Sequence, residues 1–251
     1  MSILRTDSLS VSFGGIQALA GVDLEIEPGG VTGLIGPNGA GKTTFIDAVT
    51  GMVANTGSVE LDGEEISGLT ANERANRGLV RTFQTLELFE DLTVEDNLAA
   101  AAVHTKWWQF IVDALIPRRS QSSIPAVEWA LELLGIADDR HRLPADLSHG
   151  RRRLVGVARA LAANPKVLLL DEPAAGLDSA ESLALGARLR SIADTGVTVF
   201  LIDHDMGLVL DVCDRIHVLD FGSVIASGSP DEIRTNPAVV AAYLGRAAET
   251  S

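Results

Sequence analysis

The chain has 251 residues, 46% of them hydrophobic, and a formal net charge of −14 at pH 7. This length can bury the core of one large α/β domain or of two smaller lobes. The acidic balance disfavours binding of nucleic acid through its phosphates, so no nucleic-acid partner is expected, although a local pocket can still hold an anion.

Two further features of the composition narrow the class of protein. The single cysteine, Cys213, excludes an intramolecular disulfide, fits a reducing compartment, and is interpreted as a small buried apolar side chain. The N-terminus lacks a basic-then-apolar signal pattern. No apolar run approaches the ~18 residues that a membrane span needs, so we expect a soluble protein that can dock onto a membrane protein.

The N-terminal third of the chain predicts mainly strands. Alternating polarity, short apolar runs and Gly-rich turns predict four of them, at residues 3–12, 18–30, 31–36 and 57–63. A helix is predicted from residue 41 to about Gly51. Thr70, with Glu73 three residues later, predicts the capping box of a second, short helix.

The rest of the chain changes character twice. From residue 86 to about 147 helical periodicity dominates, and we interpret this stretch as a mostly helical insertion. Further strands are then predicted at 166–173, 198–205 and 215–228, with helices at 182–194 and 206–213 and two short helices opening at Ser229-Pro230 and Asn236-Pro237. This alternation predicts an α/β fold with a mainly parallel sheet covered on both faces.

One motif carries most of the chemistry. GPNGAGKT, residues 36–43, matches the G-x-x-x-x-G-K-[S/T] phosphate-binding loop between a predicted strand and a predicted helix. Its glycines let successive N–H groups point inward, and the helix N-terminus adds partial positive charge. Lys42 supplies a full charge at the β- and γ-phosphates, the Thr43 hydroxyl suits Mg²⁺, and Thr44 adds a further contact. The predicted phosphate contacts are Gly36, Pro37, Asn38, Gly39, Ala40, Gly41, Lys42, Thr43 and Thr44.

Two adjacent carboxylates and a histidine follow buried strands. Asp171 and Glu172 end an apolar run, and because side chains alternate along a strand they are predicted to point in different directions. Asp171 then addresses Mg²⁺, directly or through water, and Glu172 acts as general base on a water. His204 follows the next apolar run and is interpreted as a contact for the γ-phosphate and that water. The alternatives are solvated strand-end carboxylates and a structural histidine.

With these residues in place, the chain resembles the ATP-binding subunits of ABC transporters over nearly its whole length. The Walker A loop of that family is matched by residues 36–44 and its Walker B strand by 167–172. The Q-loop glutamine is matched by Gln84, the D-loop by AGLD ending in Asp178, and the switch histidine by His204. Phe13 falls where the family places an aromatic side chain under adenine; the alternative is a core residue at a strand end.

The resemblance implies a fold and an activity. It implies a P-loop NTPase fold in one ABC domain, 1–251, with an N-terminal antiparallel β subdomain, a helical subdomain at 86–150 and a C-terminal helical extension at 228–251. It also implies ATP hydrolysis with Mg²⁺ on the cytoplasmic face of the membrane, with permease subunits as partners. The implied catalytic residues are Glu172, His204, Gln84 and Lys42, and the implied metal ligands are Thr43, Gln84 and Asp171.

The stretch LSHGR, residues 147–151, matches the LSGGQ signature, which in this family closes on the ATP held by a second subunit. Ser148, Gly150 and Asp178 are the implied contacts to that nucleotide. His149 replaces a glycine, at a cost of ~1 kcal/mol if the site needs a positive φ, and Arg151 replaces a glutamine. The facing site is then weaker, and an asymmetric heterodimer becomes a candidate. The arginine run 151–153 is interpreted as a solvated helix face.

Smaller features favour one group within the family. RTFQ, PAAGL and the C-terminal IRTNPAVVAAYLG resemble the larger ATPase subunit of the branched-chain amino-acid importer group. The alternatives are lipopolysaccharide export, urea or amide import, a soluble ABC-type ATPase acting on ribosomes or DNA, and a catalytically silent partner. The apolar residues Leu86, Leu88, Phe89 and Leu92 are read either as a groove for a permease helix or as core.

Overall fold

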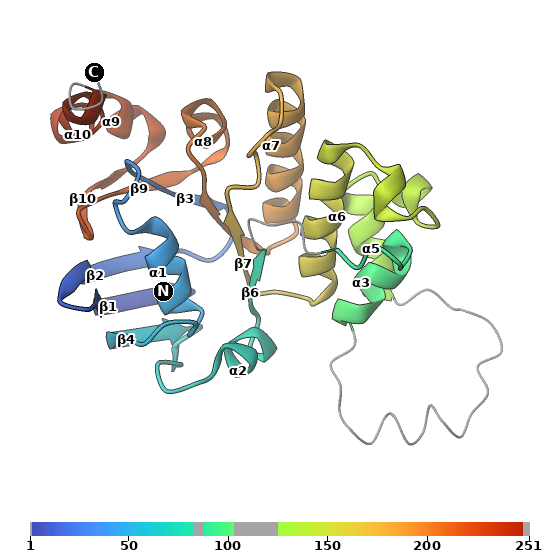
Figure 1. Ribbon diagram of the computed structural model, residues 1–251, viewed down its shortest axis with the longest axis horizontal. Helices are drawn as coiled ribbons and strands as arrows, with labels where there is room; N and C mark the ends of the chain where they lie inside the picture. The colour runs from blue at the N-terminus through green and yellow to red at the C-terminus, as the bar shows by residue number, and fades with distance from the viewer. Residues whose placement is uncertain (1, 83–87, 103–124, 248–251) are drawn as a thin grey trace. The chain divides into compact units, whose positions relative to one another are not determined.

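The computed structural model describes residues 2–82, 88–102 and 125–247 (Figure 1). The chain divides into two compact units, one formed by residues 1–84 with 166–251 and the other by residues 85–165. In the parts of the chain that the structure describes, no helix is both long and apolar enough to cross a membrane.

The first unit contains a four-stranded antiparallel sheet in the order β2-β1-β4-β5. Its strands are β1 (Leu4–Phe13), β2 (Ile16–Ile26), β4 (Thr56–Leu61) and β5 (Glu64–Glu65). Alternate residues of β2 are buried, among them Leu24 and Ile26, as the alternating sequence predicts. The two-residue strand β5 is not predicted, because it is too short to show a period.

A second sheet of the same unit positions the loops that matter for function. Its strand order is β10-β9-β3-β8-β7-β6, with the five strands from β9 to β6 parallel and β10 antiparallel. The strands are β3 (Val31–Ile35), β6 (Leu79–Thr82), β7 (Val167–Asp171), β8 (Thr198–Ile202), β9 (Arg215–Asp220) and β10 (Ser223–Gly228). Every residue of β3, β7 and β8 is buried. Because these strands are parallel, the loops that follow them leave the same edge of the sheet.

Helices cover both faces of this sheet. The helices of the first unit are α1 (Lys42–Val49), α2 (Ala71–Asn76), α7 (Ser179–Asp194), α8 (Met206–Val212), α9 (Pro230–Thr235) and α10 (Pro237–Ala247). Leu34 of β3 shares a core with α1 and the antiparallel sheet. The neighbouring Gly33 faces the other way, where an added Cβ would lie 2.9 Å from the Cys213 sulfur and 3.1 Å from Val209. The predicted two-faced sheet is therefore confirmed.

Local side-chain signals set several helix starts. The capping box predicted from Thr70 and Glu73 is present at the start of α2. Asp178 and Glu181 form another, so α7 begins at Ser179 rather than at the predicted residue 182. Cys213 is buried, as predicted, and burial raises the pKa of its thiol to about 12.

Helices are the regular structure of the described part of the second unit. It contains α3 (Val94–Ala102), α5 (Pro125–Leu133), α6 (His149–Ala162) and two short 3-10 helices, Ala137–Asp139 and Pro144–Asp146. Helix α6 packs against both α3 and α5. The described residues of the second unit contain no strand, which agrees with the helical periodicity of the sequence.

Candidate functional site

A pocket of about 440 Å³ opens beside the loop that follows β3. Its lining combines the Walker A loop with parts of β2, the residue after β7, and the turn between β9 and β10. The lining residues are Ile16, Gln17, Ala18, Asn38, Gly39, Ala40, Gly41, Lys42, Thr43, Thr44, Glu172, Phe221 and Gly222. Seven consecutive residues of the predicted phosphate loop thus meet in one cavity.

The backbone of the Walker A loop suits an anion. Gly41 is the N-cap of α1 with φ 106°, and it offers no side-chain cap to the free N–H groups of the helix. No acidic residue lies in the first turn of α1, so its positive end is not offset there. Only glycine fits at the two ends of the loop: an added Cβ would lie 2.1 Å from the Leu219 carbonyl oxygen at Gly36, and 2.7 Å from that of Ala18 at Gly41.

Lys42 is held over its own loop. Its Nζ donates to the carbonyl oxygens of Gly36, at 2.7 Å, and Pro37, at 3.1 Å. On α10, burial raises the pKa of the Tyr243 phenol, and the nearby backbone of Gly36 opposes that rise. The C-terminal helix therefore comes close to the first residue of the phosphate loop.

Asp171 ends β7 in a buried ion-pair cluster. Its Oδ2 accepts from Arg81 Nη2 of β6 at 2.7 Å, and Arg81 also pairs with Asp47 of α1. Burial raises the pKa of Asp171, and the Arg81 guanidinium opposes that rise. Arg81 lies inside the RTFQ motif, and no role is predicted for it from the sequence. The register of β6 against β7 brings it to Asp171.

The surroundings of Asp171 fit a magnesium ion. The second oxygen of Asp171, Oδ1, is buried and has no hydrogen-bond partner among the described residues. No group of three or more metal-ligating side chains occurs in the described part of the chain. Mg²⁺ is commonly bound by one or two carboxylates, water and substrate phosphates rather than by a full protein cage. A single buried carboxylate oxygen is consistent with that donor set.

Glu172 occupies a different environment from Asp171, as predicted from strand alternation. Its φ of 48° turns the chain immediately after β7, and its N–H donates to the Ile202 carbonyl oxygen at 2.7 Å. Its side chain lines the pocket of the Walker A loop, whereas Asp171 is 1% exposed. A non-glycine residue with positive φ is uncommon and often marks a functional position.

His204 follows β8 and is largely exposed, with its Nδ1 3.7 Å from Asp203 Oδ1. It is not among the residues that line the Walker A pocket. The buried Asp203 accepts from the N–H groups of Ala174 and Asp205, so it joins the loop after β7 to the loop after β8. No role is predicted for Asp203 from the sequence, although a carboxylate at the end of an apolar strand is a signal for one.

Three further residues of the first unit are predicted to contact nucleotide or metal. Asp178 is the exposed N-cap of α7. Phe13 ends β1 and is 52% exposed, so its alternative interpretation as a core residue is wrong, and it does not line the pocket. Gln84 lies outside the described residues.

In the second unit, Ser148 caps the signature helix. Its Oγ accepts from the Arg151 N–H at 3.3 Å, and Gly150 lies in the first turn of α6. His149 is the first helical residue and has no positive φ, so the anticipated strain of ~1 kcal/mol does not apply. The start of α6 therefore tolerates a side chain where the family's motif has glycine.

The arginine run is not simply a solvated face, which corrects the sequence interpretation. Arg151 donates to the Gly135 carbonyl oxygen at 3.1 Å and pairs at 3.0 Å with the buried Asp139. Arg152 is three-quarters buried and pairs with Glu90. These contacts fix the start of α6 within its own unit.

The apolar residues predicted either as a groove for a permease helix or as core differ in their exposure. Leu88 is buried, whereas Phe89 and Leu92 are 54% and 38% exposed. Asn97 holds the backbone of Phe89 through its side-chain amide, and Arg159 lies 5.9 Å from the Phe89 ring centroid. Leu86 lies outside the described residues.

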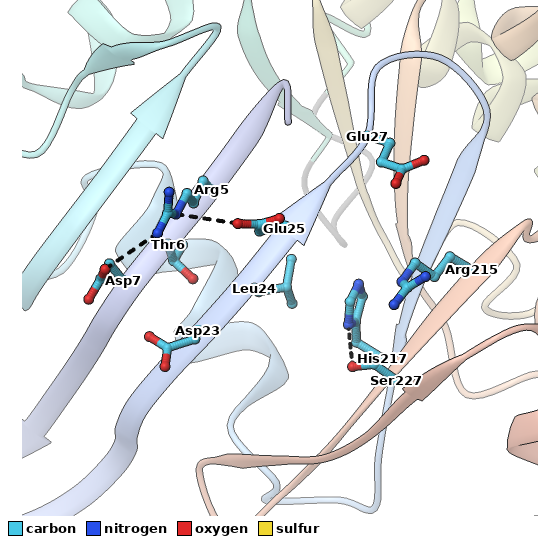
Figure 2. A pocket seen from close by; sticks show the side chains of 10 residues that line it. All are labelled: Arg5, Thr6, Asp7, Asp23, Leu24, Glu25, Glu27, Arg215, His217 and Ser227. Carbon is cyan, nitrogen blue, oxygen red and sulfur yellow. Dashed lines mark hydrogen bonds and ion pairs between the residues drawn. The ribbon is translucent and has the colours of Figure 1, made fainter. Parts of the chain in front are cut away.

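A second pocket, of about 420 Å³, lies between the β1–β2 pair and the β9–β10 pair (Figure 2). Four carboxylates line it, from Asp7, Asp23, Glu25 and Glu27, against two guanidinium groups, from Arg5 and Arg215. Figure 2 shows Arg5 already paired with Asp7 and Glu25. The excess of negative charge makes this second pocket less suitable for a triphosphate than the Walker A pocket.

His217 lines the second pocket and makes stability depend on pH. It is 4% exposed, its Nδ1 lies 2.7 Å from Ser227 Oγ, and burial, followed by the nearby Arg215, lowers its pKa to about 4. An unfolded histidine takes up its proton near pH 6.5. Between pH 6.5 and 4 the unfolded chain therefore binds the extra proton. The contribution of neutral, buried His217 to the free energy of unfolding is therefore fully present above pH 6.5. It is lost as pH falls toward 4.

Because of His217, we expect the free energy of unfolding of the wild type to fall by about 3 kcal/mol between pH 7 and pH 4. His217→Asn should lack this part of the fall. Urea unfolding of both proteins across that range measures the difference. His141→Asn, at an exposed histidine, is the matched control and should follow the wild type. Parallel pH curves for wild type and His217→Asn would contradict the prediction.

The glycine loop after β3, the uncapped start of α1 and the buried carboxylate at the end of β7 define a P-loop nucleotide-binding protein. The chain belongs to the ABC transporter family, whose model matches residues 19–175. A second model, described as branched-chain amino acid ATP-binding cassette transporter, matches residues 223–249.

Named relatives cover the whole length. The chain is 42% identical to the high-affinity branched-chain amino acid transport ATP-binding protein BraF of Pseudomonas aeruginosa, and 40% identical to LivG of Escherichia coli, over 98% of each chain. It is 36% identical to the lipopolysaccharide export system ATP-binding protein LptB of Haemophilus influenzae, again over 98% of both.

Among solved structures, an ATP-binding cassette of an ABC transporter in its ADP conformation matches with a TM-score of 0.85 and 31% identity. The match covers 98% of this chain and 99% of that one. The chain is thus an ATP-binding, ATP-hydrolysing subunit of an ABC transporter.

Proposed function

We propose that this subunit powers the import of branched-chain amino acids through permease partners, working on the cytoplasmic face of the membrane. The observation that carries this proposal is the C-terminal match at residues 223–249, which names the same cargo class as the full-length relatives BraF and LivG. Lipopolysaccharide export is the second candidate, favoured by the 36% identity to LptB, and urea or amide import is a third.

We also propose how the domain is used. Residues 1–251 form one ABC domain, in which 86–150 serve as the helical subdomain and 228–251 as a C-terminal extension. Two such domains, identical or different, enclose two ATP molecules. The Walker A loop of one subunit holds the same nucleotide as Ser148 and Gly150 of the other subunit's signature and Asp178 of its D-loop. ATP then favours the closed pair because it binds that state better.

The proposed chemistry gives each of the predicted site residues a role. Gly36 to Thr44 cradle the phosphates with backbone N–H groups, and Lys42 moves its ammonium from the loop carbonyls to the β- and γ-phosphates. Glu172 accepts a proton from the attacking water, while His204 and Gln84 orient the γ-phosphate and that water. Thr43, Asp171 and Gln84 would hold Mg²⁺, which offsets charge on the phosphates when bound. Phe13 is the proposed stacking partner of adenine.

Uptake measurements test the cargo. Cells lacking the chain should lose uptake of radiolabelled leucine, isoleucine and valine and regain it with the wild-type chain but not with Glu172→Gln. Urea uptake and surface lipopolysaccharide are measured in the same cells. Normal branched-chain uptake together with a defect in urea uptake or in lipopolysaccharide would reject the proposed cargo in favour of the corresponding alternative.

A further inference from the structure

The turn between β9 and β10 is tied to the nucleotide pocket from two sides. The N–H of Gly222 donates to the Ala40 carbonyl oxygen in the Walker A loop, at 2.9 Å. The carbonyl oxygen of Gly222 accepts from Ala20 of β2, at 2.8 Å. An added Cβ at Gly222 would lie 2.6 Å from the Ala18 carbonyl oxygen, so the turn sits directly against β2. These contacts fix the position of the preceding residue, Phe221.

Phe221 has an unfavourable backbone conformation for its residue type. Its φ is 45°, in the left-handed region that glycine and asparagine adopt far more easily than an aromatic residue. Its side chain is 75% exposed and lines the Walker A pocket. Strained backbone and an exposed aromatic ring together point to a binding role, because neither favours the folded state of the free chain.

The pocket lining has two chemical characters. Lys42, Thr43 and Thr44 supply a cation, hydroxyls and helix N–H groups, which suit phosphates. Ile16 and Phe221, each 75% exposed, supply large apolar surfaces. A nucleotide has the same two characters, a charged tail and a flat π-system. Phe13, the residue that the family resemblance assigns to the base, does not line this pocket.

We propose that Phe221, together with Ile16, forms an apolar wall that contacts the purine base of ATP. This inference rests on the proposed nucleotide site and adds a base-binding residue from the C-terminal part of the chain. The ring of Phe221 offers a face or an edge to the base, and contacts of this kind add affinity without selecting a hydrogen-bonding pattern. The wall should therefore affect nucleotides and not a bare polyphosphate.

Calorimetric titration with Mg·ATP and with Mg·tripolyphosphate tests the wall. Phe221→Ala should weaken ATP binding about tenfold and leave tripolyphosphate binding within twofold. Phe221→Trp, which keeps an aromatic ring, should bind ATP within about threefold of the wild type. Phe221→Asn, which tolerates the positive φ, provides a second ring-less variant that keeps the turn and should lose ATP affinity as Phe221→Ala does.

Phe13→Ala is the comparison variant: Phe13 is also an exposed phenylalanine, and because it is the proposed stacking partner of adenine its removal should lower ATP affinity as well. Unchanged ATP affinity in Phe221→Ala and Phe221→Asn would overturn the wall, and a loss in Phe13→Ala alone would assign the base to Phe13. Equal losses of affinity for ATP and for tripolyphosphate in the Phe221 variants would also overturn the wall. They would show that the turn only supports the Walker A loop. Failure of the wild type to bind either ligand would instead reject the nucleotide site itself, and the wall with it.

Discussion

Glu172→Gln is expected to lower the rate of ATP hydrolysis by about 10²–10⁴-fold while leaving ATP binding intact. Glu172 lines the Walker A pocket just after β7, and glutamine has nearly the same shape and the same tolerance of the observed φ of 48°. The substitution therefore removes the proposed proton acceptor with little other change. Phosphate release under saturating Mg·ATP measures turnover, and calorimetry measures binding.

A second consequence concerns assembly. If hydrolysis releases the closed pair, Glu172→Gln should keep ATP and form a stable dimer in size-exclusion chromatography with Mg·ATP, together with a sister subunit if the pair is a heterodimer. Glu27→Gln, at an exposed glutamate of the second pocket, is the matched control and should hydrolyse ATP normally. Turnover of Glu172→Gln equal to that of the wild type would remove Glu172 as the general base.

Lys42→Ala is expected to weaken Mg·ATP binding by at least about a hundredfold. The ammonium of Lys42 lies over the Walker A loop, held by the carbonyl oxygens of Gly36 and Pro37, and among the described residues it is the only lysine or arginine that lines that pocket. In a pocket partly shielded from water, one missing charge beside a triphosphate costs several times what it would cost in bulk solvent. Calorimetry with Mg·ATP and with ADP measures the loss, which should be larger for ATP.

The control for this prediction is Lys166→Ala. Lys166 is about half exposed and pairs with Asp62, away from the lining of the pocket, so its removal should leave nucleotide affinity within twofold. Thermal unfolding without nucleotide should be similar for Lys42→Ala and the wild type. A Lys42→Ala protein that binds ATP as tightly as the wild type would contradict a phosphate cradle in residues 36–44.

Much of the fold is readable from the sequence, because the features that specify it are local. The apolar runs that become β3, β7 and β8 are continuous, as strands buried on both faces require. The capping box of Thr70 and Glu73 spans only four residues and forms as predicted. By contrast β6, four residues long, is not predicted, because it is too brief to show a period.

The phosphate loop can be identified from residues 36–44 alone, since they are contiguous and their glycines, lysine and threonines carry the chemistry wherever the loop is placed. The distant groups that complete the surroundings of that loop are visible only in the folded chain. Arg81 reaches Asp171 across 90 residues, and Phe221 enters the pocket through a turn bonded to Ala40. Such pairs depend on strand register and on the packing of one sheet against another, and a one-residue shift in register would separate them.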